Sequence, residues 1–290
     1  MRTGDTLTEN AYAKINLFLD VTGKRSDGYH DIASIMQTVS LCDSISVTVS
    51  DSDGISCSDT SLACDKSNLA WKALDLFRHE SGMDFSASIR IEKNIPVAAG
   101  MAGGSTDAAA VLRILNRMTG EPFSADALAS MSAKIGSDVP FCVSGGTKLA
   151  RGRGEILSDI PSCPKMFLVV AIRGEHVSTP WAYGLIDTKF GDFSEHKTEK
   201  ELSLMKNALL CGDALSVINA SYNIFEEPVS AHRPQVTVLK NELMAYGAVR
   251  ALMSGSGPSV IGFFDDEKVA QSAEKKLRES GTSAFFCTTT

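Results

Sequence analysis

The sequence predicts a mixed α/β protein, of the α+β class, that is divided into two domains. Segments rich in β-branched residues alternate with segments of helical periodicity. Around residues 151–164 this pattern breaks into Arg-Gly-Arg-Gly and then Pro-Ser-Cys-Pro, and a strand-like run follows. The length of 290 residues and the hydrophobic content of 43% allow two cores. We therefore predict domains of residues 1–155 and 156–290.

The first half of the chain is expected to form a sheet that helices cover on one face. Strands are predicted at residues 13–22, 44–49 and 87–91, and helices at residues 68–80, 106–118 and 125–134. The helix at 106–118 has apolar side chains at the spacing of a single helical face, namely Ala108, Val111, Leu112, Leu115 and Met118. That face can pack on the sheet.

The second half has the order β, α, β, β, α, β, which is typical of a ferredoxin-like layer, with extra helices. Strands are predicted at residues 166–172, 248–253, 260–264 and 284–287, and helices at 179–186, 199–210, 213–225, 235–246 and 267–279. The polar stretch 187–200 is expected to be a solvated, mobile loop.

Composition favours small-molecule chemistry. The net charge of -7 argues against a nucleic-acid partner, and no apolar run is long enough to predict a membrane span. Residues 1–10 lack the pattern of a signal peptide, so we expect a cytoplasmic protein. The seven cysteines are scattered and odd in number, without a CxxC pair, which favours free thiols over a disulfide frame or a zinc site. The oligomeric state is not predicted.

A glycine-rich loop joins a strand-like segment to an alanine-rich helix, and it is typical of a phosphate-binding loop. Its residues are Pro96, Val97, Ala98, Ala99, Gly100, Met101, Ala102, Gly103, Gly104, Ser105 and Thr106. Gly100, Gly103 and Gly104 let the backbone turn tightly and approach a ligand. Ser105, Thr106 or Asp107 is expected to cap a helix whose N-terminus attracts an anion. The alternative is a glycine-rich turn that only starts a helix.

Three further motifs carry candidate polar groups. Lys14 and Asn16 share one face of an apolar strand, where a ligand or a carboxylate must meet the lysine unless the pair faces water at an edge. Asp138 lies in a turn before a predicted apolar strand, as a pocket carboxylate or as an ordinary Asx turn. The small-residue loop 251–259 is either a plain hairpin or a close backbone approach to a substrate or to the glycine loop.

In this order, the four motifs resemble those of the GHMP kinases. The resemblance spans residues 11–264, and its most specific part joins Ala-Lys-Ile-Asn-Leu at 13–17 to Asp-Gly-Tyr-His at 27–30. It implies an N-terminal domain with the fold of ribosomal protein S5, which binds ATP, and a ferredoxin-like C-terminal domain. It also implies an ATP-dependent kinase that uses magnesium as the counter-ion of the nucleotide.

The resemblance assigns a role to each matching residue. Lys14 and Asp138 are the implied catalytic pair: Asp138 accepts the proton of the substrate hydroxyl, and Lys14 keeps that carboxylate ionised and stabilises the transferred phosphoryl group. The glycine loop is the implied ATP-phosphate site. Asn68 and Lys93 match positions that line the adenosine pocket.

Within the family, the motif at 13–30 is typical of a kinase that phosphorylates a cytidine-containing polyol on the non-mevalonate route to isoprenoid precursors. Asn16, Tyr29, His30 and Tyr183 match its cytidine side, with Tyr29 stacking on the base, His30 bonding the edge of the base and Tyr183 as a second aromatic ring. The alternatives are another GHMP kinase, which needs no such base clamp, and a silent binding protein, which needs no Lys14 and Asp138.

The sequence departs from the family pattern inside the glycine loop. Met101 and Thr106 replace a leucine and a serine conservatively. Ala102 stands where the family has glycine, and it is tolerated without strain only if its φ angle is negative.

Overall fold

The structure is a computed structural model that describes residues 2–97, 99–175, 177–191, 193 and 198–290. The chain forms two compact units. The first unit comprises Met1–Ala13, Cys42–Val97 and Ala102–Gly145, and the second comprises Lys14–Leu41, Ala98–Met101 and Gly146–Thr290. The long strands β1 (Thr6–Lys24) and β2 (His30–Ser50) each contribute residues to both units. The boundary between residues 155 and 156 stays a prediction.

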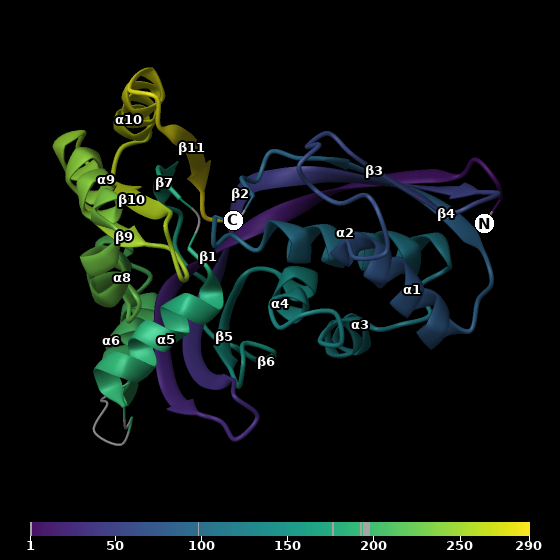
Figure 1. Cartoon of the computed structure of the whole chain (residues 1–290), viewed down its shortest axis with the longest axis horizontal. Helices are drawn as coiled ribbons and strands as arrows, with labels where there is room; N and C mark the ends of the chain where they lie inside the picture. The colour runs from purple at the N-terminus through teal and green to yellow at the C-terminus, as the bar shows by residue number, and fades with distance from the viewer. Residues whose placement is uncertain (1, 98, 176, 192, 194–197) are drawn as a thin grey trace. The chain divides into compact units, whose positions relative to one another are not determined.

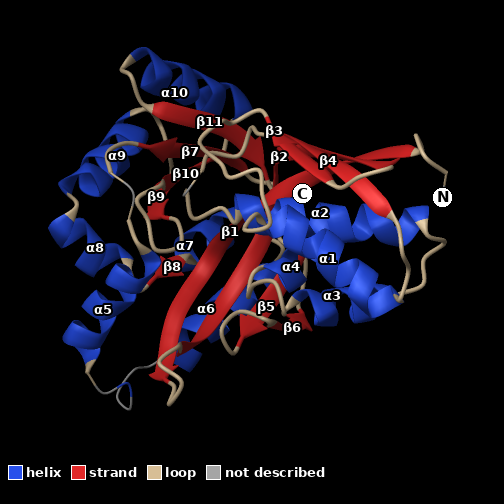
Figure 2. Ribbon diagram, turned by 45° about the vertical axis from the view of Figure 1, so that its right-hand side comes forward, coloured by secondary structure: helices blue, strands red, loops and turns tan. Residues whose placement is uncertain are grey.

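In the first unit, β2 pairs antiparallel with β4 (Ser86–Glu92), which pairs in parallel with β3 (Gly54–Cys57). The helices are α1 (Leu69–Ser81), α2 (Gly103–Met118), α3 (Ala125–Ser132) and α4 (Val139–Ser144). They lie together beside these strands (Figure 2). The apolar face predicted for α2 is buried: Ala108, Val111, Leu112 and Leu115 share one core with the sheet.

In the second unit, a four-stranded antiparallel sheet has the order β11-β7-β10-β9. Its strands are β7 (Phe167–Ile172), β9 (Arg250–Met253), β10 (Val260–Phe264) and β11 (Ser283–Thr288). The helices α9 (Pro234–Ala245) and α10 (Glu267–Glu279) pack on this sheet (Figure 1). This arrangement is the ferredoxin-like layer, so that prediction is confirmed.

Among the described residues, the remaining elements of the second unit are three short strands, which extend the sheet of β1 and β2, and four helices. The strand β1 pairs in parallel with β8 (Tyr222–Asn223), and β2 pairs with β5 (Thr147–Arg151), which pairs with β6 (Ile156–Asp159). The helices are α5 (Thr179–Phe190), α6 (Thr198–Cys211), α7 (Ala214–Ala220) and α8 (Glu226–His232).

Three sequence predictions are wrong in detail. The segment after Asp138 is the short helix α4 and not a strand, because apolar residues in a run of six do not reveal their period. The helix predicted at 213–225 ends at Ala220, where β8 adds to the edge of β1. The loop predicted at 187–200 is helical at both ends, since α5 extends to Phe190 and α6 begins at Thr198; residues 192 and 194–197 lie outside the described residues.

All seven cysteines are free thiols. In the described part of the chain, no helix combines the length and the apolar character that crossing a membrane requires.

Candidate active site

The first half of the glycine loop is held by the loop between β9 and β10. Gly100 has a φ angle of +67°, and a Cβ atom there would lie 2.9 Å from the carbonyl oxygen of Ser254. The Ser259 hydroxyl donates to the carbonyl oxygen of Ala99. The backbone of residues 254–259 therefore supports the glycine loop, and the prediction that segment 251–259 approaches this loop closely is confirmed.

The second half of the loop opens α2, whose first turn has no side-chain cap. The N-cap residue is Ala102, and Gly103 and Gly104 are the first two helical residues. The expectation that Ser105, Thr106 or Asp107 caps the helix is therefore wrong, because these residues lie inside it; the Thr106 hydroxyl donates to the Gly103 carbonyl. A first turn without a side-chain cap leaves its N–H groups for an anion.

The glycines of this loop differ in backbone conformation. Gly100 needs its positive φ angle, whereas Gly103 and Gly104 have helical backbone, contrary to the expectation that they form tight turns. Ala102 has a φ angle of 59° in the left-handed region, so an alanine takes a strained conformation at the position where the resemblance implies glycine. Ala98, also predicted in the loop, lies outside the described residues.

Lys14 and Asn16 lie on β1 in the second unit, and they are buried rather than at a solvent-exposed edge of the sheet. Their exposures are 6% and 3%. The Lys14 Nζ donates to Asn16 Oδ1 at 3.0 Å, and Asn16 Nδ2 donates to the Ser34 hydroxyl at 2.8 Å. The backbone N–H of Lys14 also donates to the Met101 carbonyl at 3.2 Å. The structure thus brings the predicted catalytic lysine to the glycine loop.

Asp138 is the N-cap residue of α4, and its side chain makes no hydrogen bond to the first turn of that helix. The Asx-type capping role is therefore absent, while Pro140 in the first turn fixes the helix start.

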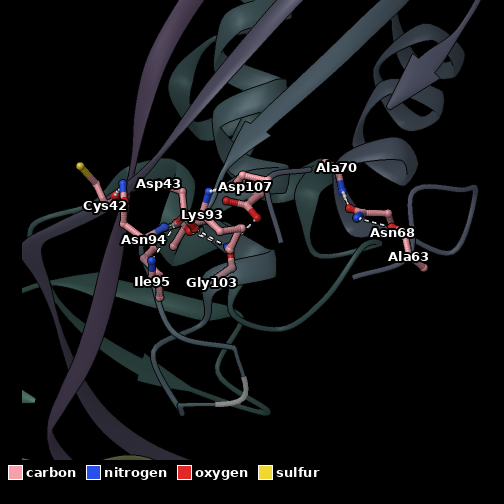
Figure 3. Close-up of polar contacts among 12 residues, drawn as sticks. Cys42, Asp43, Ala63, Asn68, Ala70, Lys93, Asn94, Ile95, Gly103 and Asp107 are labelled. Carbon is pink, nitrogen blue, oxygen red and sulfur yellow. Dashed lines mark hydrogen bonds and ion pairs between the residues drawn. The ribbon is translucent and has the colours of Figure 1, made fainter. Parts of the chain in front are cut away.

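Lys93, which the sequence placed at the adenosine pocket, forms a buried cluster with Asp43 and Asp107 (Figure 3). Its Nζ lies 2.9 Å from Asp107 Oδ2 and also contacts Asp43 Oδ2. Burial lowers the pKa of Lys93, but the attraction of Asp107 and Asp43 outweighs burial and the net shift is upward. Burial and the neighbouring Asp43 together raise the pKa of Asp107 to about 7, against the opposing attraction of Lys93.

Asn68 caps α1: its Oδ1 accepts from the Ala70 N–H at 2.9 Å and its Nδ2 donates to the Ala63 carbonyl at 2.8 Å (Figure 3). Such a cap stabilises a helix by about 1 kcal/mol. The binding of adenosine by Asn68 and Lys93 stays a prediction.

His30 begins β2 and is held by residues of α5. Its Nε2 lies 2.7 Å from Asp187 Oδ1, and Lys24 Nζ lies 2.6 Å from the other oxygen of that carboxylate. The His30 and Tyr183 rings stack with centroids 4.7 Å apart. Burial raises the pKa of Asp187, but the hydrogen bonds from Lys24 and His30 outweigh it, so the net shift is downward.

Tyr29 is 57% exposed, and the Arg153 guanidinium lies over its ring at 5.1 Å from the centroid. An exposed aromatic ring beside a cation suits stacking on a planar ligand. Among the four predicted cytidine residues, the structure brings His30 and Tyr183 together.

Sequence reasoning missed Asp43, Asp187, Arg153 and Ser34. Asp187 follows Tyr183 by four residues, so a longer prediction for that helix would have placed both on one face. Asp43 stands alone in a strand and gives no local signal.

Comparison with known proteins defines the family. Residues 68–146 match the GHMP kinases N terminal domain, and residues 202–283 match the GHMP kinases C terminal domain. The chain belongs to the GHMP kinases.

Its relatives place the chain in one branch of this family, the 4-diphosphocytidyl-2-C-methyl-D-erythritol kinases. A 4-diphosphocytidyl-2-C-methyl-D-erythritol kinase from Clostridium kluyveri is 41% identical over 280 residues, which cover 96% of this chain and 98% of the relative. One from Gloeobacter violaceus is 39% identical over 98% of this chain and 94% of its own length. A crystal structure of 4-(cytidine 5'-diphospho)-2C-methyl-D-erythritol kinase has a TM-score of 0.80 at 30% identity and covers 97% of this chain and 98% of its own.

Proposed function

We propose that the chain transfers the γ-phosphoryl group of ATP to the 2-hydroxyl of 4-diphosphocytidyl-2-C-methyl-D-erythritol, a step toward isoprenoid precursors. Relatives named 4-diphosphocytidyl-2-C-methyl-D-erythritol kinase match nearly the full chain. The single observation that carries the proposal is Lys14, buried on β1 with its backbone bonded to the glycine loop. A buried lysine whose strand is hydrogen-bonded to a glycine-rich loop suits a role in phosphoryl transfer.

Each candidate residue has a stated task in this reaction. Asp138 accepts the proton of the attacking hydroxyl. Lys14 stabilises negative charge on the transferred phosphoryl group, and Asn16 orients Lys14 through the bond between their side chains. The glycine loop binds the phosphates of ATP with backbone N–H groups at the start of α2. Tyr29, His30 and Tyr183 recognise the cytosine.

Magnesium enters this scheme with the nucleotide. The described residues contain no group of three His, Cys, Asp or Glu side chains placed to hold a metal ion. Mg²⁺ keeps several waters and binds substrate phosphates with few protein ligands, so the donor set fits a nucleotide-bound ion. Bound in this way, Mg²⁺ would neutralise charge on the phosphates.

The test is ATP turnover with 4-diphosphocytidyl-2-C-methyl-D-erythritol beside homoserine and mevalonate. Turnover only with the cytidyl substrate supports the proposal. Turnover with 2-C-methyl-D-erythritol 4-phosphate at the same kcat/KM as the full substrate contradicts the cytosine clamp. Turnover of homoserine or mevalonate alone contradicts the proposed substrate but not the proposed kinase activity.

A further inference from the structure

The buried cluster of Asp43, Lys93 and Asp107, which we call the acidic triad, contains two acidic groups and only one basic group. The side chain of Lys93 is 6% exposed, that of Asp43 is 0% exposed and that of Asp107 is 3% exposed. Two ionised carboxylates and one ammonium leave one net negative charge. A buried, uncompensated charge is costly, and such groups commonly change protonation state instead.

The hydrogen bonds indicate which carboxyl group takes a proton. Asp43 Oδ1 accepts from the backbone N–H groups of Asn94 and Ile95 at 2.6 and 2.8 Å, and its Oδ2 contacts Lys93. Asp107 Oδ2 accepts from Lys93, whereas its Oδ1 is buried with no hydrogen-bond partner among the described residues. A proton on Asp107 turns this oxygen atom into a donor. Burial and the proximity of Asp43 also raise the pKa of Asp107, to about 7.

The acidic triad lies next to the first turn of α2. A Cβ atom on Gly103, the first residue of that helix, would lie 3.2 Å from Lys93 Nζ. Figure 3 shows Lys93, Asp107 and Gly103 gathered at this point. A net negative charge here opposes the field of the helix N-terminus, which otherwise favours an anion. The charge of the triad therefore affects any phosphate group bound at the first turn.

We propose that Asp107 is a positioning residue of the nucleotide site, and that it takes up a proton from solvent when a polyphosphate binds at the start of α2. The triad is then neutral toward the phosphates. This inference rests on the proposed function, because it requires ATP to bind at the glycine loop. Asp107 does not touch the reacting atoms in this proposal; it acts through the charge of the triad.

The groups that face Asp107 are few. Lys93 follows β4, Asp43 belongs to β2, and the Cys57 thiol of β3 interacts with the triad at longer range. The buried side chains of α1 and α4 in this core are apolar, namely Ala70, Ala73, Leu74, Phe77 and Val139. Protonation of Asp107 thus changes the charge of the triad from minus one to zero, with Lys93 charged and Asp43 ionised.

The direction of the pH effect follows from linkage. If bound phosphate favours the protonated form of Asp107, then protonation strengthens phosphate binding by the same factor. For a coupling of about tenfold and a free pKa of about 7, ATP binding takes up roughly half a proton at pH 7.5. The dissociation constant should increase about sixfold between pH 6.5 and 8.5.

The experiment is isothermal titration of the whole protein with MgATP, without acceptor substrate, at pH 7.5 in two buffers of different ionisation enthalpy. Excess magnesium keeps the nucleotide ionised. The wild type should take up roughly half a proton per nucleotide. Asp107→Asn, which mimics the neutral form, should bind MgATP with no such uptake. Asp84→Asn removes an exposed loop carboxylate of the same unit and should behave as the wild type.

The outcomes separate this inference from the proposed function. A wild type that binds no MgATP contradicts the proposed function itself. Equal proton uptake by the wild type and Asp107→Asn overturns the role of Asp107 while leaving the kinase proposal intact. If Asp107→Asn does not fold, the wild type decides alone: a dissociation constant for MgATP that is constant between pH 6.5 and 8.5 overturns the inference.

Discussion

The imidazole of His30 is oriented from two sides by α5. Its Nε2 lies 2.7 Å from Asp187 Oδ1, and its ring stacks on Tyr183 at an interplanar angle of 25°. Asp187 and Tyr183 are four residues apart, so one face of the helix presents both groups. A histidine held in this way has a fixed ring plane and a fixed role for one ring nitrogen, which suits the proposed recognition of cytosine.

Asp187→Asn should therefore weaken recognition of the cytidyl substrate. The neutral amide is a poorer partner for His30 and for Lys24, so we expect KM for the cytidyl substrate to rise about tenfold. KM for ATP should stay unchanged. Steady-state kinetics with each substrate varied in turn measures both, and Asp31→Asn, a more exposed carboxylate bonded to Arg25, is the matched control. An equal rise in both KM values would contradict the positioning role.

Asp138→Asn should retain binding but lose catalysis. Because the amide cannot accept the hydroxyl proton, we expect kcat to fall by roughly 10²–10⁴-fold with little change in either KM. Rapid-quench or steady-state phosphoryl transfer measures the loss, and calorimetric titration with ATP checks that the site is intact. A variant with near wild-type kcat would leave Asp138 as a helix-start residue only.

Gly100→Ala should destabilise the protein, whereas Gly104→Ala should not. The φ angle of +67° at Gly100, and a Cβ atom 2.9 Å from the Ser254 carbonyl, leave no room for a side chain. We expect a loss of roughly 1–3 kcal/mol in the free energy of unfolding. At Gly104 the nearest atom to a Cβ is Leu69 Cδ1 at 3.5 Å, an ordinary contact in a helical residue. Urea unfolding of both variants tests the contrast, and equal stabilities would refute it.

Ala102→Gly should stabilise the protein. An alanine in the left-handed conformation destabilises the folded state by roughly 1–2 kcal/mol. Glycine removes this strain, but its greater conformational freedom favours the unfolded chain by only about 0.4–1 kcal/mol. The net gain is about 0.5–1 kcal/mol in the free energy of unfolding. The opposite result is expected for Ala109→Gly inside α2, which should lose stability. Thermal and urea unfolding measure both, and a destabilised Ala102→Gly would mean that the φ angle of 59° carries no strain.

The stability of Asp107→Asn relative to the wild type should depend on pH. The pKa of Asp107 is raised from 3.8 to about 7 in the folded state, so the folded protein binds the proton more tightly than the unfolded chain. The wild type therefore loses stability as pH rises from about 4 to about 7, while the amide does not titrate. Relative to the wild type, the free energy of unfolding of Asp107→Asn should increase by on the order of 2 kcal/mol between pH 5 and 8. A difference independent of pH would contradict the raised pKa.

Local sequence patterns were sufficient for much of the fold. The helix at 267–279 and the strand at 260–264 have the predicted bounds, because their periodicity and flanking polar residues are strong local signals. The short elements α4, α8 and β8 were missed or misread, since six, seven or two residues do not show a period.

The candidate site divides in the same way. The glycine loop, Lys14 and Asn16 were singled out from residue type and spacing. The structure buries Lys14 and Asn16, and their functional role stays a prediction. The cap predicted at Ser105, Thr106 or Asp107 was wrong, because the helix begins two residues before Ser105, at Gly103. Helix ends are the least certain part of a local pattern.

The sequence by itself determined the mixed fold class, the ferredoxin-like order of the second half, the glycine-rich loop and the family motifs, because each depends on residues close together in the chain. Only the tertiary structure decided which charges share a buried site. Asp43 meets Lys93 across 50 residues and Asp107 meets it across 14. Such pairs depend on how strands and helices pack, and the cost of burying their charge exists only once packing has excluded water.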